Sequence, residues 1–126
     1  MLTDAEALEA VRRHFESLFP RSCPTCDRVY PTLREYVSLT RPIGPPRSWD
    51  ADLGDWEARI PVGSHALANC TCGSTLALST EGMGAERQRV LLDWLQQACR
   101  RRGLSPTELL EWMRAEIRRE VLEGPA

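Results

Sequence analysis

Four of the five cysteines in this chain fall into two close pairs, Cys23-Pro24-Thr25-Cys26 and Cys70-Thr71-Cys72-Gly73. Zinc in structural sites takes four ligands in a tetrahedron, and cysteine thiolates serve it well. A short turn presents two sulfur atoms to one ion, so two such turns supply all four corners. The spacing therefore predicts one structural metal ion, zinc by preference, bound by Cys23, Cys26, Cys70 and Cys72.

The residues beside the cysteines favour the same interpretation. Pro24 stiffens the first turn, and Gly73 can adopt the positive φ that lets backbone N–H groups approach sulfur. With these two turns the chain resembles zinc-ribbon proteins, in which two cysteine knuckles, at least one on a β-hairpin, clasp a zinc ion. It departs from the usual pattern in its second knuckle, which has one intervening residue, and in the longer gap between the knuckles. The resemblance also implies nucleic-acid binding as an alternative function.

Other uses of the same cysteines stay open. An iron–sulfur cluster also accepts four cysteines, and a C-x2-C pair can be a thiol–disulfide redox site. Redox pairs normally stand at a helix N-terminus after a strand, whereas Cys23 follows a predicted helix and a proline. Buried free cysteines without metal, and a zinc site whose thiolates sense oxidants, are further alternatives.

A shell of four thiolates leaves no position for water, which a catalytic zinc ion needs. We therefore expect a structural ion and no enzymatic activity. His14 is expected to be exposed on the first helix, and His65 is a weak candidate to replace one thiolate. Cys99 is expected to be a small buried hydrophobic residue. An acidic cluster lacks the spacing of a calcium-binding loop and is interpreted as a solvated turn; it comprises Asp50, Asp52, Asp55 and Glu57.

The composition of the 126 residues is typical of one soluble globular domain, with 42% hydrophobic and 27% charged residues. All 16 positively charged residues are arginine, which excludes mechanisms that need a lysine amine. The net charge of −2 argues against strong non-specific binding to nucleic acid. The acidic N-terminal segment lacks the features of a secretory signal, and no apolar run is long enough to span a membrane. We expect a cytoplasmic protein.

Helices are predicted at both ends of the chain. Thr3 and Glu6 form a capping box before an apolar face that repeats at helical spacing: Leu8, Val11, Phe15 and Leu18. A second capping box at Thr32 and Glu35 predicts a short helix. Residues 85–102 form a third, ended by Gly103. Ser105, Pro106 and Glu108 begin a fourth, and the short connection predicts that these two helices fold into a hairpin.

The middle of the chain is predicted to contain the strands. Apolar and polar residues alternate from Trp56 to Val62, which predicts a half-buried strand. Residues 66–69 and 74–80 predict two further strands joined by the turn that bears Cys70 and Cys72. The proline-rich segment 40–52 is predicted to be a loop.

Two further features bear on function. Arg100-Arg101-Arg102 is the only basic run, expected to be a solvated helix end and otherwise a contact for phosphate or RNA with Arg118 and Arg119. Trp94 and Trp112 lie beside the apolar stripes, which suits either burial against the metal-binding module or an interface with a protein partner. An exposed face there would favour a homodimer.

Together these observations predict an α+β fold in one domain, residues 1–126. It would comprise an N-terminal helix (1–22), a zinc-ribbon-like metal-binding β module (23–82) and a C-terminal helical hairpin (83–126). The predicted function is that of a zinc-stabilised regulatory or adaptor protein that binds another macromolecule through its helices. The alternatives are a nucleic-acid-binding protein and a redox or iron–sulfur sensor.

Overall fold

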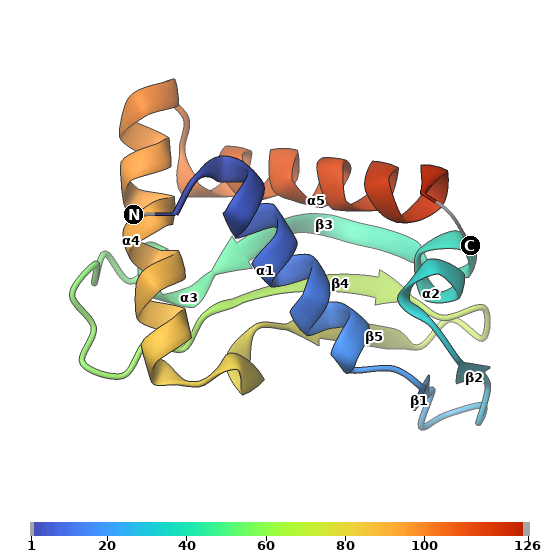
Figure 1. The fold of residues 1–126 in the computed structure, drawn as a ribbon. Coiled ribbons are helices and arrows are strands. Elements are labelled where there is room, and N and C mark those ends of the chain that lie inside the picture. The colour runs from blue at the N-terminus through green and yellow to red at the C-terminus, as the bar shows by residue number, and fades with distance from the viewer. Residues whose placement is uncertain (1, 125–126) are drawn as a thin grey trace.

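The computed structural model describes residues 2–124 (Figure 1). Its elements follow one another in the order α1 (Asp4–Ser17), β1 (Arg21–Ser22), β2 (Val29–Tyr30), α2 (Leu33–Leu39), β3 (Arg41–Ser48), α3 (Trp49–Asp52), β4 (Ser64–Asn69), β5 (Thr75–Ser79), η1 (Glu81–Met83), α4 (Ala85–Arg102) and α5 (Pro106–Glu123).

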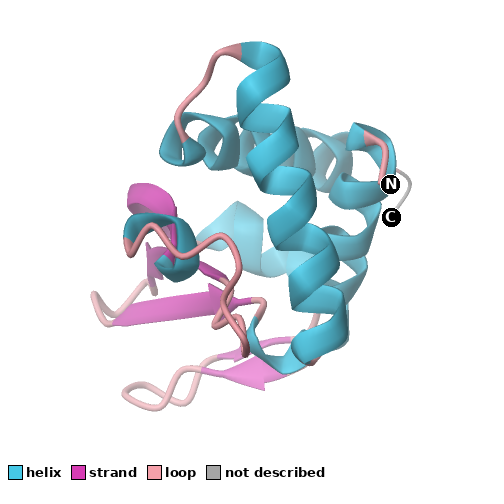
Figure 2. Ribbon diagram, turned by 90° about the vertical axis from the view of Figure 1, so that its left-hand side faces the viewer, coloured by secondary structure: helices cyan, strands magenta, loops and turns pink. Residues whose placement is uncertain are grey.

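The strands form two antiparallel sheets. β3, β4 and β5 make a three-stranded sheet in that order, while β1 and β2 form a separate short hairpin. Helices α1, α4 and α5 gather on one side of the larger sheet (Figures 1 and 2). The predicted α+β class is therefore confirmed. No helix within residues 2–124 combines the length and apolar character needed to cross a bilayer.

The helix boundaries follow the capping signals of the sequence. Thr3 and Ser105 each accept from the backbone of a glutamate three residues later, and both capping boxes are complete. Thr32 caps α2 through the N–H of Glu35, although the reciprocal half of that box is not formed. Gly103 ends α4 in the left-handed conformation, with φ of 65°. After this turn, α5 runs across the direction of α4 rather than back alongside it (Figure 1).

The prediction of a loop over residues 40–52 is wrong, because this segment forms β3 and α3. β3 lies at the edge of its sheet. The open side of an edge strand has no neighbouring strand to bond, so proline, which lacks an N–H group, is tolerated there. The pairing with β4 shifts between Ile43 and Arg47. This irregularity accommodates Gly44, with φ of 62°, and the two prolines that follow it.

The prediction of a strand over residues 56–62 is also wrong, because the chain is irregular from α3 to β4. The alternation of Trp56 and Ala58 has another cause. Trp56 packs against the helices and its carbonyl accepts from Arg89 at 3.0 Å, while Ala58 is buried. The two predicted strands around Cys70 and Cys72 are confirmed as β4 and β5.

The buried apolar residues form two clusters. The helical core comprises Ala7, Leu8, Val11, Leu92, Trp94, Leu95, Ala98, Leu109, Leu110, Met113 and Ile117. The sheet core comprises Cys23, Tyr30, Leu33, Tyr36, Val37, Ala68, Cys70, Leu76 and Leu78. Phe15 and Val121 are partly buried and pack against both cores. Each core therefore draws on distant parts of the chain.

Contacts of α4 with the start of α1 and with α5 change the interpretation of the tryptophans and the basic run. Trp94 is only 2% exposed, so it offers no face to a partner, and its indole N–H donates to Asp4 Oδ1 at 3.0 Å. Arg101 and Arg102 form ion pairs with the same carboxylate. The Arg102 guanidinium also lies 4.0 Å from the centre of the half-buried Trp112 ring. Most of this basic run is therefore engaged within the chain.

Candidate metal centre

The first cysteine pair lies at the tip of the β1–β2 hairpin. Ser22 pairs with Val29, so the turn between them must reverse the chain around the cysteines. The N–H of Cys23 donates to the carbonyl of Arg28, and the N–H of Asp27 donates to the carbonyl of Cys23, both at 2.9 Å. Asp27 has a positive φ of 63°. This tight turn fixes Cys23 in the interior and leaves Cys26 exposed.

The second pair lies at the tip of the β4–β5 hairpin. The N–H of Cys70 donates to the carbonyl of Ser74, and the N–H of Gly73 donates to the carbonyl of Cys70, both at 2.8 Å. Gly73 has a positive φ of 94°, which fits its expected role in the turn. Cys70 is buried and Cys72 is exposed. The two knuckles therefore have the same design, with the first cysteine inside and the second outside.

The structure brings the four cysteines of the two knuckles together. Their sulfur atoms all lie within 4.8 Å of one another. Cys23 Sγ is 3.7 Å from Cys72 Sγ, and Cys26 Sγ is 3.7 Å from Cys70 Sγ. A tetrahedral site with metal–sulfur bonds of about 2.3 Å has sulfur–sulfur edges of about 3.8 Å. All four cysteines are free thiols, so the cluster has the size and the donor set of a metal site.

Side chains around the cluster add contacts that the sequence did not reveal. Tyr30 is fully buried and its hydroxyl lies 3.0 Å from Cys70 Sγ. Arg28 lies over the Tyr30 ring and donates to Thr71 Oγ1 at 3.2 Å, which links the two knuckles directly. Tyr30 could have been noted as an aromatic residue just after a cysteine turn. Nothing in the spacing pointed to Arg28.

Groups around the thiols lower the pKa of two of them and raise the pKa of a third. The N–H of Cys72 and then the Tyr30 hydroxyl lower the pKa of Cys70 to about 6. The hydroxyl and N–H of Ser74 lower the pKa of Cys72. The N–H of Arg28 lowers the pKa of Cys26, but desolvation and the neighbouring thiols outweigh it and raise this pKa to about 11. Coordinating thiols are deprotonated. Four thiolates this close repel one another, and the positive charge of a bound cation would offset that repulsion.

The two histidines lie outside the cluster of four. His65 pairs with Ser79 at the far end of the β4–β5 ladder and stacks on Trp49, with ring centres 4.3 Å apart. His14 is half-buried rather than exposed, and its Nε2 lies 3.0 Å from the carbonyl oxygen of Ser79. The expectation of an exposed His14 is wrong because α1 ends beside β5.

Two other side chains that the sequence analysis singled out, Cys99 and Asp50, also lie outside the cysteine cluster. Cys99 is half-buried beside the helical core, where burial raises its pKa. Asp50 is only 3% exposed, so the prediction that it lies in a solvated turn is wrong. Its carboxylate accepts from the N–H groups of Val62 and Gly63, at 3.0 and 2.8 Å, and so anchors the irregular segment before β4.

The chemistry open to the cluster follows from its donor set. Four sulfur ligands fill a tetrahedral shell, and such a shell holds a metal without an open position for water. No protein-family model, curated protein or solved structure matches this chain. The interpretation of the cluster therefore rests on its geometry.

Proposed function

We propose that this is a zinc-stabilised regulatory or adaptor protein that binds another macromolecule and is not an enzyme. The main support is the sulfur cluster, whose 3.7 Å spacings suit a tetrahedral ion. Its ligands come from two hairpin tips that are distant in sequence, so the ion would join β1–β2 to β4–β5. Zinc is preferred because it favours tetrahedral thiolate sites.

Exposed apolar side chains support the adaptor role. Val90 on α4 and Leu122 on α5 are 44% and 38% exposed, although most of the apolar stripes of these helices are buried. Such residues offer apolar surface that a protein partner would bury. The nucleic-acid alternative loses support, because Arg101 and Arg102 both pair with the Asp4 carboxylate, which offsets one of their two positive charges.

Metal analysis of protein purified without chelator tests the metal centre. We expect about one zinc ion per chain and no visible absorption. Cys70→Ser should lose the ion, whereas Cys99→Ser, the matched control outside the cluster, should keep it. Iron together with visible absorption would mean that the cysteines hold an iron–sulfur cluster and not zinc. Absence of metal together with reactive thiols would overturn the metal centre.

Partner binding needs a separate test. A photo-crosslinking residue at position 90 or 122 should give a discrete product in the host cell, whereas the same residue at the exposed Arg13 should not. Equal products at all three positions, or none, would contradict contact through the helices. Binding to nucleic acid with steep salt dependence would favour the nucleic-acid alternative instead.

The exposure of Cys26 and Cys72 favours a second candidate, a redox-sensitive metal switch. Hydrogen peroxide would oxidise two thiolates to one disulfide, would itself be reduced to water with two protons, and would release the ion. Zinc release by peroxide that a thiol reductant reverses would support the switch. Retention of zinc under those conditions would reject it.

A further inference from the structure

A cavity of about 110 Å³ lies between the helical core and the sheet core. It is lined from the helical side by residues such as Val11, Leu95 and Ile117, and from the sheet side by Tyr36 and Leu78. No cysteine lines it. The cavity is therefore independent of the metal centre.

Small side chains on the sheet explain why this space is not filled. Ala66 and Ala68 of β4 stand opposite the buried Leu78 and Leu76 of β5, so all four lie on the inner face of the sheet. Pro42 of β3 is paired with Ala68 and lines the cavity too. An alanine leaves a gap that a larger apolar residue would fill.

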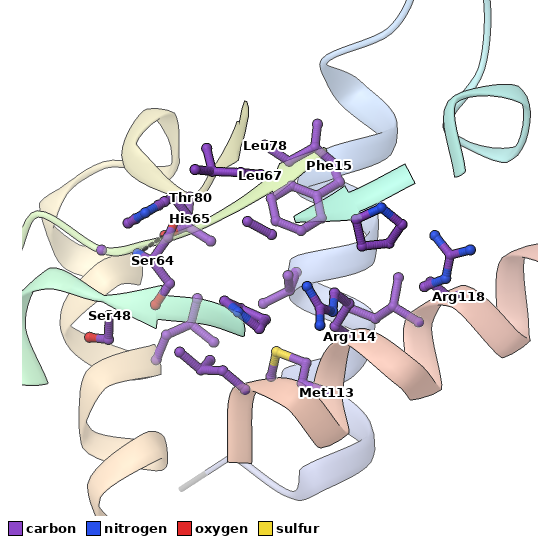
Figure 3. Close-up of a pocket in the computed structure, with 18 of the residues that line it drawn as sticks. Phe15, Ser48, Ser64, His65, Leu67, Leu78, Thr80, Met113, Arg114 and Arg118 are labelled. Atoms are coloured by element: carbon purple, nitrogen blue, oxygen red, sulfur yellow. Dashed lines mark hydrogen bonds between the residues drawn. The ribbon is translucent and has the colours of Figure 1, made fainter. Parts of the chain in front are cut away.

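Two arginines of α5 give one side of this apolar space a positive charge. Arg114 and Arg118 are one helical turn apart, half-buried, and project from α5 beside the cavity (Figure 3). Neither forms an ion pair within residues 2–124, whereas the adjacent Arg119 pairs with Glu116 and Glu123. Arg114 donates to the carbonyl of Gly44 at 2.7 Å, and burial lowers its pKa. Like charges at this spacing are unfavourable until an anion joins them.

A buried hydroxyl next to the cavity also lacks a hydrogen-bond partner, although the groups whose charges act on it, Arg21, Tyr30 and Cys70, belong to the side of the metal centre. Tyr36 lines the cavity and is only 3% exposed, yet its hydroxyl has no hydrogen-bond partner in the described part of the chain. Leaving a buried polar group unpaired is costly, and natural folds rarely do so. By contrast Thr80 and Gln88, at the other end of the cavity, bond to each other.

We propose that this cavity binds a small organic acid, with its carboxylate at Arg114 and Arg118 and its apolar group between the two cores. A planar guanidinium suits a carboxylate better than any other side chain does. A cavity of about 150 Å³ holds benzene, so this smaller one takes at most a single ring, or a branched apolar group of about four or five carbon atoms. The space is too small for a long acyl chain. The ligand would contact both cores at once and so stabilise their packing.

Titration of the full chain with benzoate and with benzyl alcohol tests the proposal. The two probes share the ring and differ in charge. Calorimetry or backbone amide shifts should show saturable binding of benzoate about tenfold tighter than that of the alcohol, since one charged hydrogen bond is worth roughly this factor. The shifts should fall on α5 near Arg118 and on β4. Equal affinity for the two probes, or no saturable binding of either at millimolar concentration, would overturn the proposal.

Three variants sharpen this test. Arg118→Gln should remove most of the preference for benzoate, whereas Arg119→Gln, one residue along the helix and outside the cavity, should keep it. Ala66→Leu should fill the cavity and abolish binding of both probes. If Ala66→Leu does not fold, the two arginine variants still decide. Equal losses in Arg118→Gln and Arg119→Gln would mean that benzoate binds the helix surface rather than the cavity.

Discussion

The helical core and the sheet core of this protein are stabilised by different means. The helical core is built from α1, α4 and α5, which have 14, 18 and 18 residues. Its buried residues are apolar side chains at helical spacing. The sheet core draws on shorter elements: β4 and β5 with 6 and 5 residues, β2 with 2 and α2 with 7. Two of its buried residues are cysteines.

This contrast indicates which part of the chain a bound metal would stabilise. Long amphipathic helices bury enough apolar surface to stabilise one another. A hairpin with two-residue strands is marginal by itself and needs an additional link. The cysteine cluster lies beside the shortest strands of the fold, β1 and β2. Zinc would therefore supplement one core and not the whole domain.

Removal of the metal should reveal the largest difference in stability between the two cores. Chelation of the wild-type protein should remove amide-exchange protection from β1, β2 and the β4–β5 turn, with a local loss of at least about 3 kcal/mol, because metal binding and folding are coupled there. Protection in α4 and α5 should persist. Equal loss of protection in both cores would contradict the division, and so would no loss in either.

Truncation in the helical core should give the converse result. Leu109 is fully buried, and Leu109→Ala should cost about 2–5 kcal/mol in the free energy of unfolding, as large-to-small core changes do. The measurement is urea unfolding followed by circular dichroism. Bound zinc per chain should not change below the transition. Loss of zinc under native conditions would mean that the two cores are not separable.

Removal of the charge of Asp4 should give the smallest change in the free energy of unfolding. Hydrogen bonds, led by that from Arg101, lower the pKa of Asp4 from 3.8 to about 2. A lowered folded-state pKa stabilises the fold above about pH 4, and this contribution disappears as the pH falls toward 2. Asp4→Asn should cost about 1 kcal/mol at neutral pH, since the pair is partly screened by solvent. The asparagine keeps an acceptor for Trp94.

Unfolding of wild type and Asp4→Asn at several pH values measures this contribution. The difference should shrink as the pH falls from 4 to 2, and it should shrink with added salt as well. A difference that does not vary with pH would mean that Asp4 acts through packing rather than charge. Binding of metal should be equal in the two proteins.

The sequence predicted the helices and the composition of the cysteine cluster well, because their signals are local. Capping residues act within three positions, and Gly103 ends α4 through its own backbone conformation. The cysteine turns likewise need only a few adjacent residues to form. The meeting of the two turns was inferred from metal chemistry, which requires four ligands.

The sequence failed where pairing depends on distant residues. β3 is a strand because β4 lies beside it and because an edge position tolerates Pro42, Pro45 and Pro46. The alternation at Trp56 and Ala58 reflects packing of an irregular segment and not a ladder. The cavity could not have been predicted, since the gap left by Ala66 depends on which helices cover the sheet.

The placement of the cysteines along the chain also orders events during synthesis. All four precede α4 and α5 in the sequence, so they leave the ribosome before either helix does, and a metal could close the loop from Cys23 to Cys72 before those helices emerge. The contacts of α1 form later still, because Arg101 and Arg102, the partners of Asp4, are synthesised almost a whole chain after it. The nascent protein would thus hold its metal first and cover the apolar face of its first helix last, which makes that face the segment for chaperones to protect.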